Sequence, residues 1–210
     1  MAFAGFPVEG MEFYEQLVAD NSRTFWQANK GQYDEFVKQP MAELTEALAE
    51  YGPFHMFRPY NDVRFSKNKP PYKTHQGAYG ESEEGTGHYA QFSTDGLMVG
   101  AGYYAMAKDQ LTRFREAIDG DATGSELVAL VADAEKRKYS IGAIDELKTA
   151  LRGYPKDYPR IVLLRRKGPI AVREFAPRSG YTPRASSPVF GRHGPASPTC
   201  GRGSTPKSAP

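Results

Sequence analysis

The sequence predicts an α+β fold: a single domain with an antiparallel sheet, helices packed mainly on one face, and a disordered C-terminal tail. Helical periodicity fills the first quarter of the chain, alternating segments with a strong hairpin signal follow, and helical periodicity then returns. Because the helices come in runs rather than one after each strand, a segregated α+β arrangement is favoured over a doubly wound parallel sheet.

Three helices are predicted before residue 53. Met11, Tyr14 and Leu17 recur at helical spacing in the first, and Asn21 or Ser22 offers a side-chain oxygen to cap the second. The apolar residues of the second helix are Phe25, Trp26, Tyr33, Phe36 and Val37. Pro40 suits the first turn of the third helix, and Gly52-Pro53 ends it.

Strands are expected in the middle of the chain. The alternation of Val63 and Phe65 with Arg64 and Ser66 predicts a half-buried strand. A glycine-rich loop is expected over 77–87. Asp95-Gly96 then predicts a two-residue hairpin turn between strands 88–94 and 97–104, because both residues tolerate a positive φ.

The second half predicts helices followed by a last strand. Leu111, Phe114 and Ile118 mark one helix, and Thr123-x-x-Glu126 is a capping-box pattern for the start of the next. The segment 139–151 fits no single type of element. Pro159 favours the start of a short helix, and a strand is expected over 170–175.

The chain divides by composition into an expected domain, 1–175, and a tail, 176–210. The tail holds 7 Pro, 5 Gly and 6 Ser, which predicts disorder because too little apolar surface is available for burial. Five of the 27 basic residues and none of the 25 acidic residues lie in the tail. Residues 1–175 therefore hold 22 bases and 25 acids, a net charge of −3, which disfavours nucleic-acid binding by the domain as a whole.

Composition also limits where the protein is expected in the cell and which kinds of site it can form. Cys200 is the only cysteine, so no intrachain disulfide forms, and a reducing, cytoplasmic location is expected. Neither a targeting segment nor a membrane-spanning apolar run is expected from the pattern of residues. The scattered His55, His75 and His88 show no metal-ligand spacing, so no metal site is predicted. Neither a cofactor nor an oligomeric state is indicated.

The strongest functional signal is the basic segment, residues 58–75. Its sixteen residues from Arg58 to Lys73 hold five cations and one acid, a charge of +4 in a domain that is net negative. Cations that converge on a proline-stiffened loop suit the recognition of phosphate or carboxylate groups. The predicted ligand-binding residues are Arg58, Tyr60, Asp62, Arg64, Ser66, Lys67, Lys69, Tyr72 and Lys73, with Arg23, Trp26, Asn29 and His75 as candidates for the rim.

Alternatives to this interpretation stay open. The basic segment is equally consistent with a solvated strand face and loop in which Asp62 simply pairs with Arg58 or Arg64. Trp26 and Tyr33 are expected in the core rather than in a site. The favoured function is binding of a small anionic ligand, and the alternative is a nucleic-acid-associated or scaffold protein without catalytic activity. Nothing in the sequence distinguishes binding from catalysis, so no catalytic residue is assigned.

Four stretches of the chain resemble the bacterial and fungal domain-of-unknown-function family 2461. They cover residues 21–26, 62–75, 99–103 and 152–159, and the second, which runs from Asp62 to His75, is the most specific. The resemblance implies no established activity, cofactor or catalytic residue. Members of that family usually continue past the equivalent of Phe175 into a further helix, whereas residues 176–210 resemble translation in a wrong reading frame.

Overall fold

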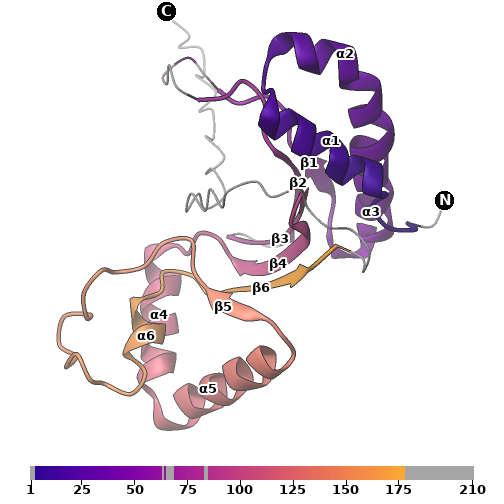
Figure 1. Cartoon of the computed structure of the whole chain (residues 1–210). Helices are drawn as coiled ribbons and strands as arrows, with labels where there is room; N and C mark the ends of the chain where they lie inside the picture. Colours follow the sequence, from indigo (N-terminus) through magenta and orange to yellow (C-terminus); the bar gives the residue numbers. More distant parts are fainter. Residues whose placement is uncertain (1–2, 63, 65–68, 83–84, 178–210) are drawn as a thin grey trace, which may run out of the picture.

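The computed structural model describes residues 3–62, 64, 69–82 and 85–177. Six of its strands form one antiparallel sheet in the order β1-β2-β3-β4-β6-β5 (Figure 1). The strands are β1 (Phe54–Met56), β2 (His75–Glu81), β3 (Thr86–Ser93), β4 (Gly96–Tyr103), β5 (Ser140–Gly142) and β6 (Ile170–Phe175). The α+β fold with an antiparallel sheet is therefore confirmed.

The N-terminal helices lie beside the β1–β2 end of the sheet (Figure 1). They are α1 (Val8–Ala19), α2 (Arg23–Tyr33) and α3 (Gln39–Ala47), and a short 3₁₀ turn at Ala49–Tyr51 follows them. Ser22 caps α2 as predicted, because its Oγ accepts a hydrogen bond of 3.1 Å from the backbone N–H of Phe25.

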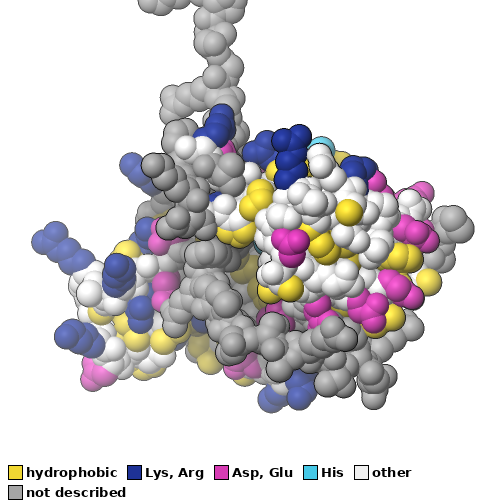
Figure 2. All heavy atoms as spheres, turned by 45° about the horizontal axis from the view of Figure 1, so that its top comes forward, with side chains coloured by type: hydrophobic (Ala, Val, Ile, Leu, Met, Phe, Trp, Pro, Cys, Tyr) yellow, Lys and Arg dark blue, Asp and Glu magenta, His cyan; other side chains and the backbone are white. Residues whose placement is uncertain are grey.

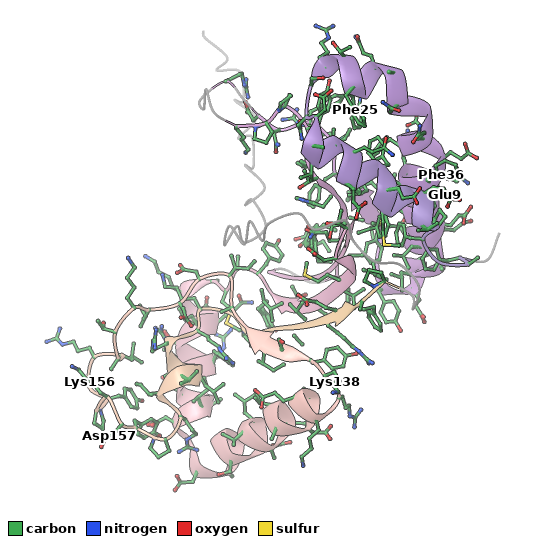
Figure 3. All side chains as sticks on the ribbon, viewed as in Figure 1. Glu9, Phe25, Phe36, Lys138, Lys156 and Asp157 are labelled. Atoms are coloured by element: carbon green, nitrogen blue, oxygen red, sulfur yellow. The ribbon has the colours of Figure 1, made fainter. Side chains whose placement is uncertain are left out.

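A π-helical turn, η1 (Asp34–Lys38), joins α2 to α3 without the break that the sequence suggested. Pro40 gives the physical reason, because it has no N–H to donate to the Phe36 carbonyl one turn earlier. Gly10 of α1 packs against that carbonyl, where an added Cβ would lie 2.5 Å from the Phe36 oxygen. Figure 3 labels Phe36 and Glu9, the residue before Gly10, at this crossing.

The main hydrophobic core lies between α1–α3 and one face of β2 and β3. Phe13 and Leu17 of α1 are fully buried there, and so is Ala78 of β2. Phe6 stacks on Phe92 of β3 at a ring-centroid distance of 3.9 Å. Helices α1–α3, which the sequence predicted, thus supply most of the side chains that cover this face of the sheet.

The prediction of a glycine-rich loop over 77–87 was wrong, because most of this segment belongs to strands β2 and β3. The two strands need glycine for packing, since a Cβ on Gly77 would lie 2.8 Å from the Tyr89 hydroxyl oxygen. A Cβ on Gly87 would lie 2.5 Å from the Tyr79 ring. Large rings on one strand therefore cover the backbone of its neighbour.

The hairpin between β3 and β4 is confirmed, but its turn lies one residue earlier than expected. Ser93 pairs with Gly96, so Thr94 and Asp95 form the turn. Gly96 has a φ of +101°, and a Cβ there would lie 2.2 Å from the Phe175 carbonyl oxygen of β6. The strand expected at 63–66 is not seen at Arg64, which lies in a turn, and the other three of these residues lie outside the described part.

A second group of helices lies beyond the β5 end of the sheet (Figure 1). It comprises α4 (Lys108–Asp119), α5 (Asp121–Lys136) and α6 (Ile161–Arg165). The predicted capping role of Thr123 was wrong: Thr123 lies inside α5, and its hydroxyl donates to the Ala117 carbonyl. The short helix after Pro159 and the strand over 170–175 are both confirmed.

In the described part of the chain, each helix is too short or too polar to span a bilayer. The expected tail, except for its first two residues, lies outside that part, as does Cys200.

A Schellman motif ends α5 with a residue in the left-handed region. The N–H of Tyr139 donates to the Ala134 carbonyl at 3.0 Å, and the N–H of Lys138 donates to the Glu135 carbonyl at 2.9 Å. Lys138, labelled in Figure 3, has a φ of +69° in this motif. Glycine is the usual residue at such a position because a Cβ is strained there.

We expect Lys138→Gly to stabilise the protein by about 1 kcal/mol, because it removes this strain. The corresponding rise in Tm is roughly 2–4 °C for a chain of this size. Differential scanning calorimetry measures the rise, and Lys136→Gly is the matched control. Lys136 is helical, so glycine there should lower the Tm. An unchanged or lower Tm for Lys138→Gly would contradict the strain argument.

Candidate functional site

A pocket of about 330 Å³ opens between the N-terminal helices and the β1 edge of the sheet. Its lining residues are Trp26, Lys30, Tyr33, Asp34, Lys38, Met56, Phe57, Arg58, Pro59, Tyr60 and Gln76. They come from α2, from η1, from β1 and the residues that follow it, and from β2. Three separate stretches of the sequence therefore meet at this pocket.

The π-helical turn contributes two charged residues to the pocket, Asp34 and Lys38. A π turn adds a residue to one helical turn and so rotates the side chains before it relative to those after it. Such turns are frequent at functional sites. The π turn that Pro40 favours thus lies where the continuous helix from α2 to α3 borders the pocket.

The first part of the basic segment is fixed against its last part by backbone hydrogen bonds. Tyr60 and Tyr72 form an antiparallel bridge. The N–H of Asn61 donates to the Pro71 carbonyl and the N–H of Lys73 donates to the Pro59 carbonyl, both at 2.8 Å. The pocket side of the segment is therefore held by paired backbone.

Asn21 ties this paired backbone to the start of α2. Its Nδ2 donates to the Tyr72 carbonyl at 3.0 Å, and its Oδ1 accepts from the Tyr72 N–H at 3.0 Å. The Tyr72 ring then stacks on Trp26, with ring centroids 4.4 Å apart and planes inclined by 9°. These contacts set the position of the basic segment relative to α2.

The inner end of the pocket is polar but internally satisfied. The Tyr33 hydroxyl donates to Oε1 of Gln76 at 2.6 Å, and the Gln76 Nε2 donates to the carbonyls of Phe57 and Gly77 at 2.8 and 2.9 Å. Burial, together with nearby Asp34, raises the pKa of Tyr33 far above its usual value. Tyr33 is therefore neutral at physiological pH and acts as a hydrogen-bond donor to Gln76.

Cations outnumber acids around the pocket. Lys30 forms an ion pair with Asp34, and the Lys38 Nζ lies 4.0 Å from the same carboxylate. Within the described part of the chain, no ion pair engages Arg58. The pocket lining thus holds three cations and one carboxylate, a local charge of +2. On the face drawn in Figure 2, Lys and Arg side chains, with one His, gather at the top of the right-hand part of the molecule, whereas most Asp and Glu side chains there lie lower.

Asp62 and Arg64 of the basic segment form an exposed pair outside the lining of the pocket. The Asp62 carboxylate accepts from the Arg64 side chain at 3.0 and 2.7 Å and from the Arg64 backbone N–H at 3.1 Å. These hydrogen bonds hold the pKa of Asp62 well below its usual range. The carboxylate therefore orients the Arg64 guanidinium and is a weak base.

Lys69, Lys73 and His75 lie beside the pocket rather than in its lining. The Lys73 Nζ is 5.3 Å from the centroid of the Phe57 ring. Burial and the positive charges of Arg58 and Lys69 lower the pKa of Lys73. Burial, with a smaller effect of Lys73, lowers the pKa of His75 to about 4. Burial is the larger cause of both shifts, and the smaller electrostatic part shows that Arg58, Lys69 and Lys73 lie close enough to repel one another or the imidazole.

The remaining predicted residues are dispersed. Arg23 is exposed at the start of α2, and the Asn29 amide donates to the Phe25 carbonyl within that helix. Trp26 and Tyr33 are buried, as the core interpretation predicted, and both also line the pocket. Ser66 and Lys67 lie outside the described residues. Of the predicted set, Arg58, Tyr60 and Trp26 are thus the residues that line the pocket.

Sequence reasoning missed several pocket residues, above all Lys30, Asp34, Lys38 and Gln76. A signal for three of them existed, because Lys30, Asp34 and Lys38 follow one another at intervals of four on one helical stretch. Gln76 gave no such signal, since it becomes a buried polar residue only through the pairing of β2. Among the described residues, no group of three His, Cys, Asp or Glu side chains could hold a metal ion.

One protein family matches the chain. The profile of a family described as conserved hypothetical protein (DUF2461) matches residues 9–189. The match includes every pocket residue and continues beyond residue 175, the expected end of the domain. No curated protein and no solved structure matches the chain.

We expect His75 to make the protein less stable at acidic pH. The unfolded chain binds a proton on His75 near pH 6.5, whereas the folded protein does so only near pH 4. Stability should therefore fall as the pH drops from about 6.5 to about 4. Thermal denaturation across this interval should show a shallower fall in Tm for His75→Gln. The matched control is His55→Gln, because His55 is exposed on β1. An equally steep fall in both variants would contradict the assignment to His75.

Proposed function

Because the chain belongs to the conserved hypothetical protein family DUF2461, whose description names no activity, we propose a function from the pocket itself. The pocket binds a small ligand that carries a phosphate or carboxylate group. Arg58 and Lys38 are the principal donors, and Lys30 completes the set of cations. No catalytic step is assigned.

The observation that carries this proposal is the position of Arg58. It lines a concave site together with two lysines, and within the described part of the chain it forms no ion pair. The Asp62 carboxylate, whose charge interacts with Arg58, is hydrogen-bonded to Arg64 instead. A guanidinium presents several N–H donors in a fixed plane, which matches the two oxygens of a carboxylate or phosphate. A bound anion would therefore supply acceptors for the Arg58 guanidinium.

The surroundings of Arg58 add support. Burial lowers the pKa of Lys73, and the positive charges of Arg58 and Lys69 lower it further. An anion in this region relieves that repulsion, so its binding energy includes attraction from beyond the pocket lining. For Asp62, Arg64, Ser66, Lys67, Lys69 and Lys73, a direct binding role remains a prediction.

The same charges weigh against nucleic acid as the main ligand. Residues 1–175 carry a net charge of −3, whereas the pocket residues carry +2. Nucleic-acid affinity depends on many phosphate contacts along an extended surface. A compact cationic site in a negative domain suits a small anion better.

We expect inorganic phosphate, pyrophosphate or citrate to raise the Tm of the full-length chain. A ligand at a hundred times its Kd stabilises the native state by about 2.7 kcal/mol through mass action. Arg58→Gln should weaken the affinity roughly tenfold or more, because a charge-assisted hydrogen bond contributes about 1.5–3 kcal/mol. Thermal-shift titration of each anion measures both effects.

The matched control is Arg64→Gln. The Arg64 side chain is 75% exposed and bound to Asp62, and it does not line the pocket. This variant should retain the full response to the anion. If Arg64→Gln lost the response and Arg58→Gln kept it, anion binding would belong to the loop and not to the pocket. A flat response of the wild type to every anion, with steeply salt-dependent binding of oligonucleotides, would favour the nucleic-acid alternative instead.

A further inference from the structure

We infer that the anionic ligand carries a flat aromatic ring and that this ring stacks on Tyr60. The inference rests on the proposed function and adds the chemical class of the ligand: an aromatic phosphate or carboxylate. Three observations support it: Tyr60 is exposed, the polar groups of the inner pocket are already hydrogen-bonded to one another, and the pocket is small.

Aromatic rings line much of the pocket. Trp26, Tyr33, Phe57 and Tyr60, here called the aromatic wall, all contribute to its surface. The Trp26 ring centroid lies 4.9 Å from that of Tyr33 and 5.8 Å from that of Tyr60. The Phe57 ring centroid lies 6.3 Å from that of Tyr89. Each ring of the wall therefore contacts another ring before any ligand arrives, which lowers the entropy cost of binding.

Tyr60 is the most exposed member of this group. Its exposed fraction is 45%, whereas that of Trp26 is 3%. Tyr60 is nevertheless fixed, because its backbone bridges to Tyr72 and its ring centroid lies 5.5 Å from that of Tyr72. An exposed, pre-positioned ring beside three cations is suited to stack against a ring that bears an anionic group.

The polar groups of the inner pocket disfavour a sugar as the uncharged part of the ligand. Both Nε2 hydrogens of Gln76 bind carbonyls, and its Oε1 accepts from the Tyr33 hydroxyl. These groups have little hydrogen-bonding capacity left for a row of ligand hydroxyls. An unsatisfied hydroxyl would lose its hydrogen bonds to water, whereas an aromatic ring has none to lose.

An aromatic wall beside a carboxylate is also typical of sites for quaternary ammonium groups. Here the carboxylate of Asp34 is already shared by Lys30 and Lys38. Arg58 adds a third positive charge to the lining. A cationic ligand would therefore meet net repulsion, and an anionic ligand is favoured.

The volume limits the size of the ligand. At about 330 Å³, the pocket lies at the small end of the range for ligand sites. One ring with its anionic group fits this volume, and a dinucleotide is too large. Phenyl phosphate is therefore the appropriate probe, and cyclohexyl phosphate is its non-planar counterpart of equal charge.

The pocket contains its own spectroscopic reporter. The chain has one tryptophan, Trp26, and it lines the pocket. Fluorescence excited at a wavelength selective for tryptophan therefore reports the occupancy of this site directly. Titration of the full-length protein with phenyl phosphate should change the Trp26 emission saturably, at the same concentrations that raise the Tm.

We expect phenyl phosphate to bind roughly three- to tenfold more tightly than cyclohexyl phosphate, which is the preference that one aromatic stacking contact confers. Tyr60→Leu should abolish this ratio while inorganic phosphate still raises the Tm. Tyr60→Phe should restore the ratio, because it retains the ring. Arg58→Gln should weaken all three phosphates.

The outcomes separate the two proposals. Equal affinities of the wild type for phenyl and cyclohexyl phosphate, or a ratio that survives in Tyr60→Leu, would overturn the aromatic inference and leave the anion pocket intact. If no phosphate changed the Tm or the Trp26 emission, the proposed function itself would fail. Tighter binding of choline than of phenyl phosphate would overturn both.

Discussion

The position of the basic segment against α2 depends on the contact between Trp26 and Tyr72. The two rings stack in parallel at 4.4 Å, and the Asn21 side chain binds both the N–H and the carbonyl of Tyr72. Stacking provides apolar burial, while the paired hydrogen bonds fix the register. This arrangement also sets the positions of Tyr60 and Arg58, because the backbone around them is paired with the backbone around Tyr72. The pocket exists because these contacts bring a loop next to a helix.

A backbone constraint shapes the other wall of the pocket. Pro40 cannot donate to the Phe36 carbonyl, the helix widens into a π turn, and Gly10 of α1 packs where that carbonyl emerges. The close approach of α1 and the placing of Asp34 and Lys38 on the pocket are therefore connected. A side chain at position 10 would push the helices apart, and the charged lining would shift with them.

Local and global electrostatics differ in sign in this protein. Residues 1–175 are net negative, yet the pocket lining holds three cations and one carboxylate, and Lys73 lies beside it. Screening limits the negative field to short range, so the local cations decide which ligands enter. Buried tyrosine and glutamine groups satisfy one another, which leaves ring surface and positive charge as the features available to a ligand.

The sequence by itself determined the elements that rest on short-range physics. The Ser22 cap, the β3–β4 hairpin, the short helix after Pro159 and β6 were all predicted, because periodicity and turn chemistry act within a few residues. It also marked Arg58, Tyr60 and Trp26. Only the tertiary structure decided that Gly77 and Gly87 lie in strands beneath tyrosine rings, and that Lys30, Lys38 and Gln76 meet Arg58. The physical reason is the same in both cases: these contacts join residues on different strands or helices, from Gly87 and Tyr79, eight positions apart, to Lys30 and Arg58, 28 positions apart. No local pattern records which side chain a neighbouring strand or helix will bring alongside.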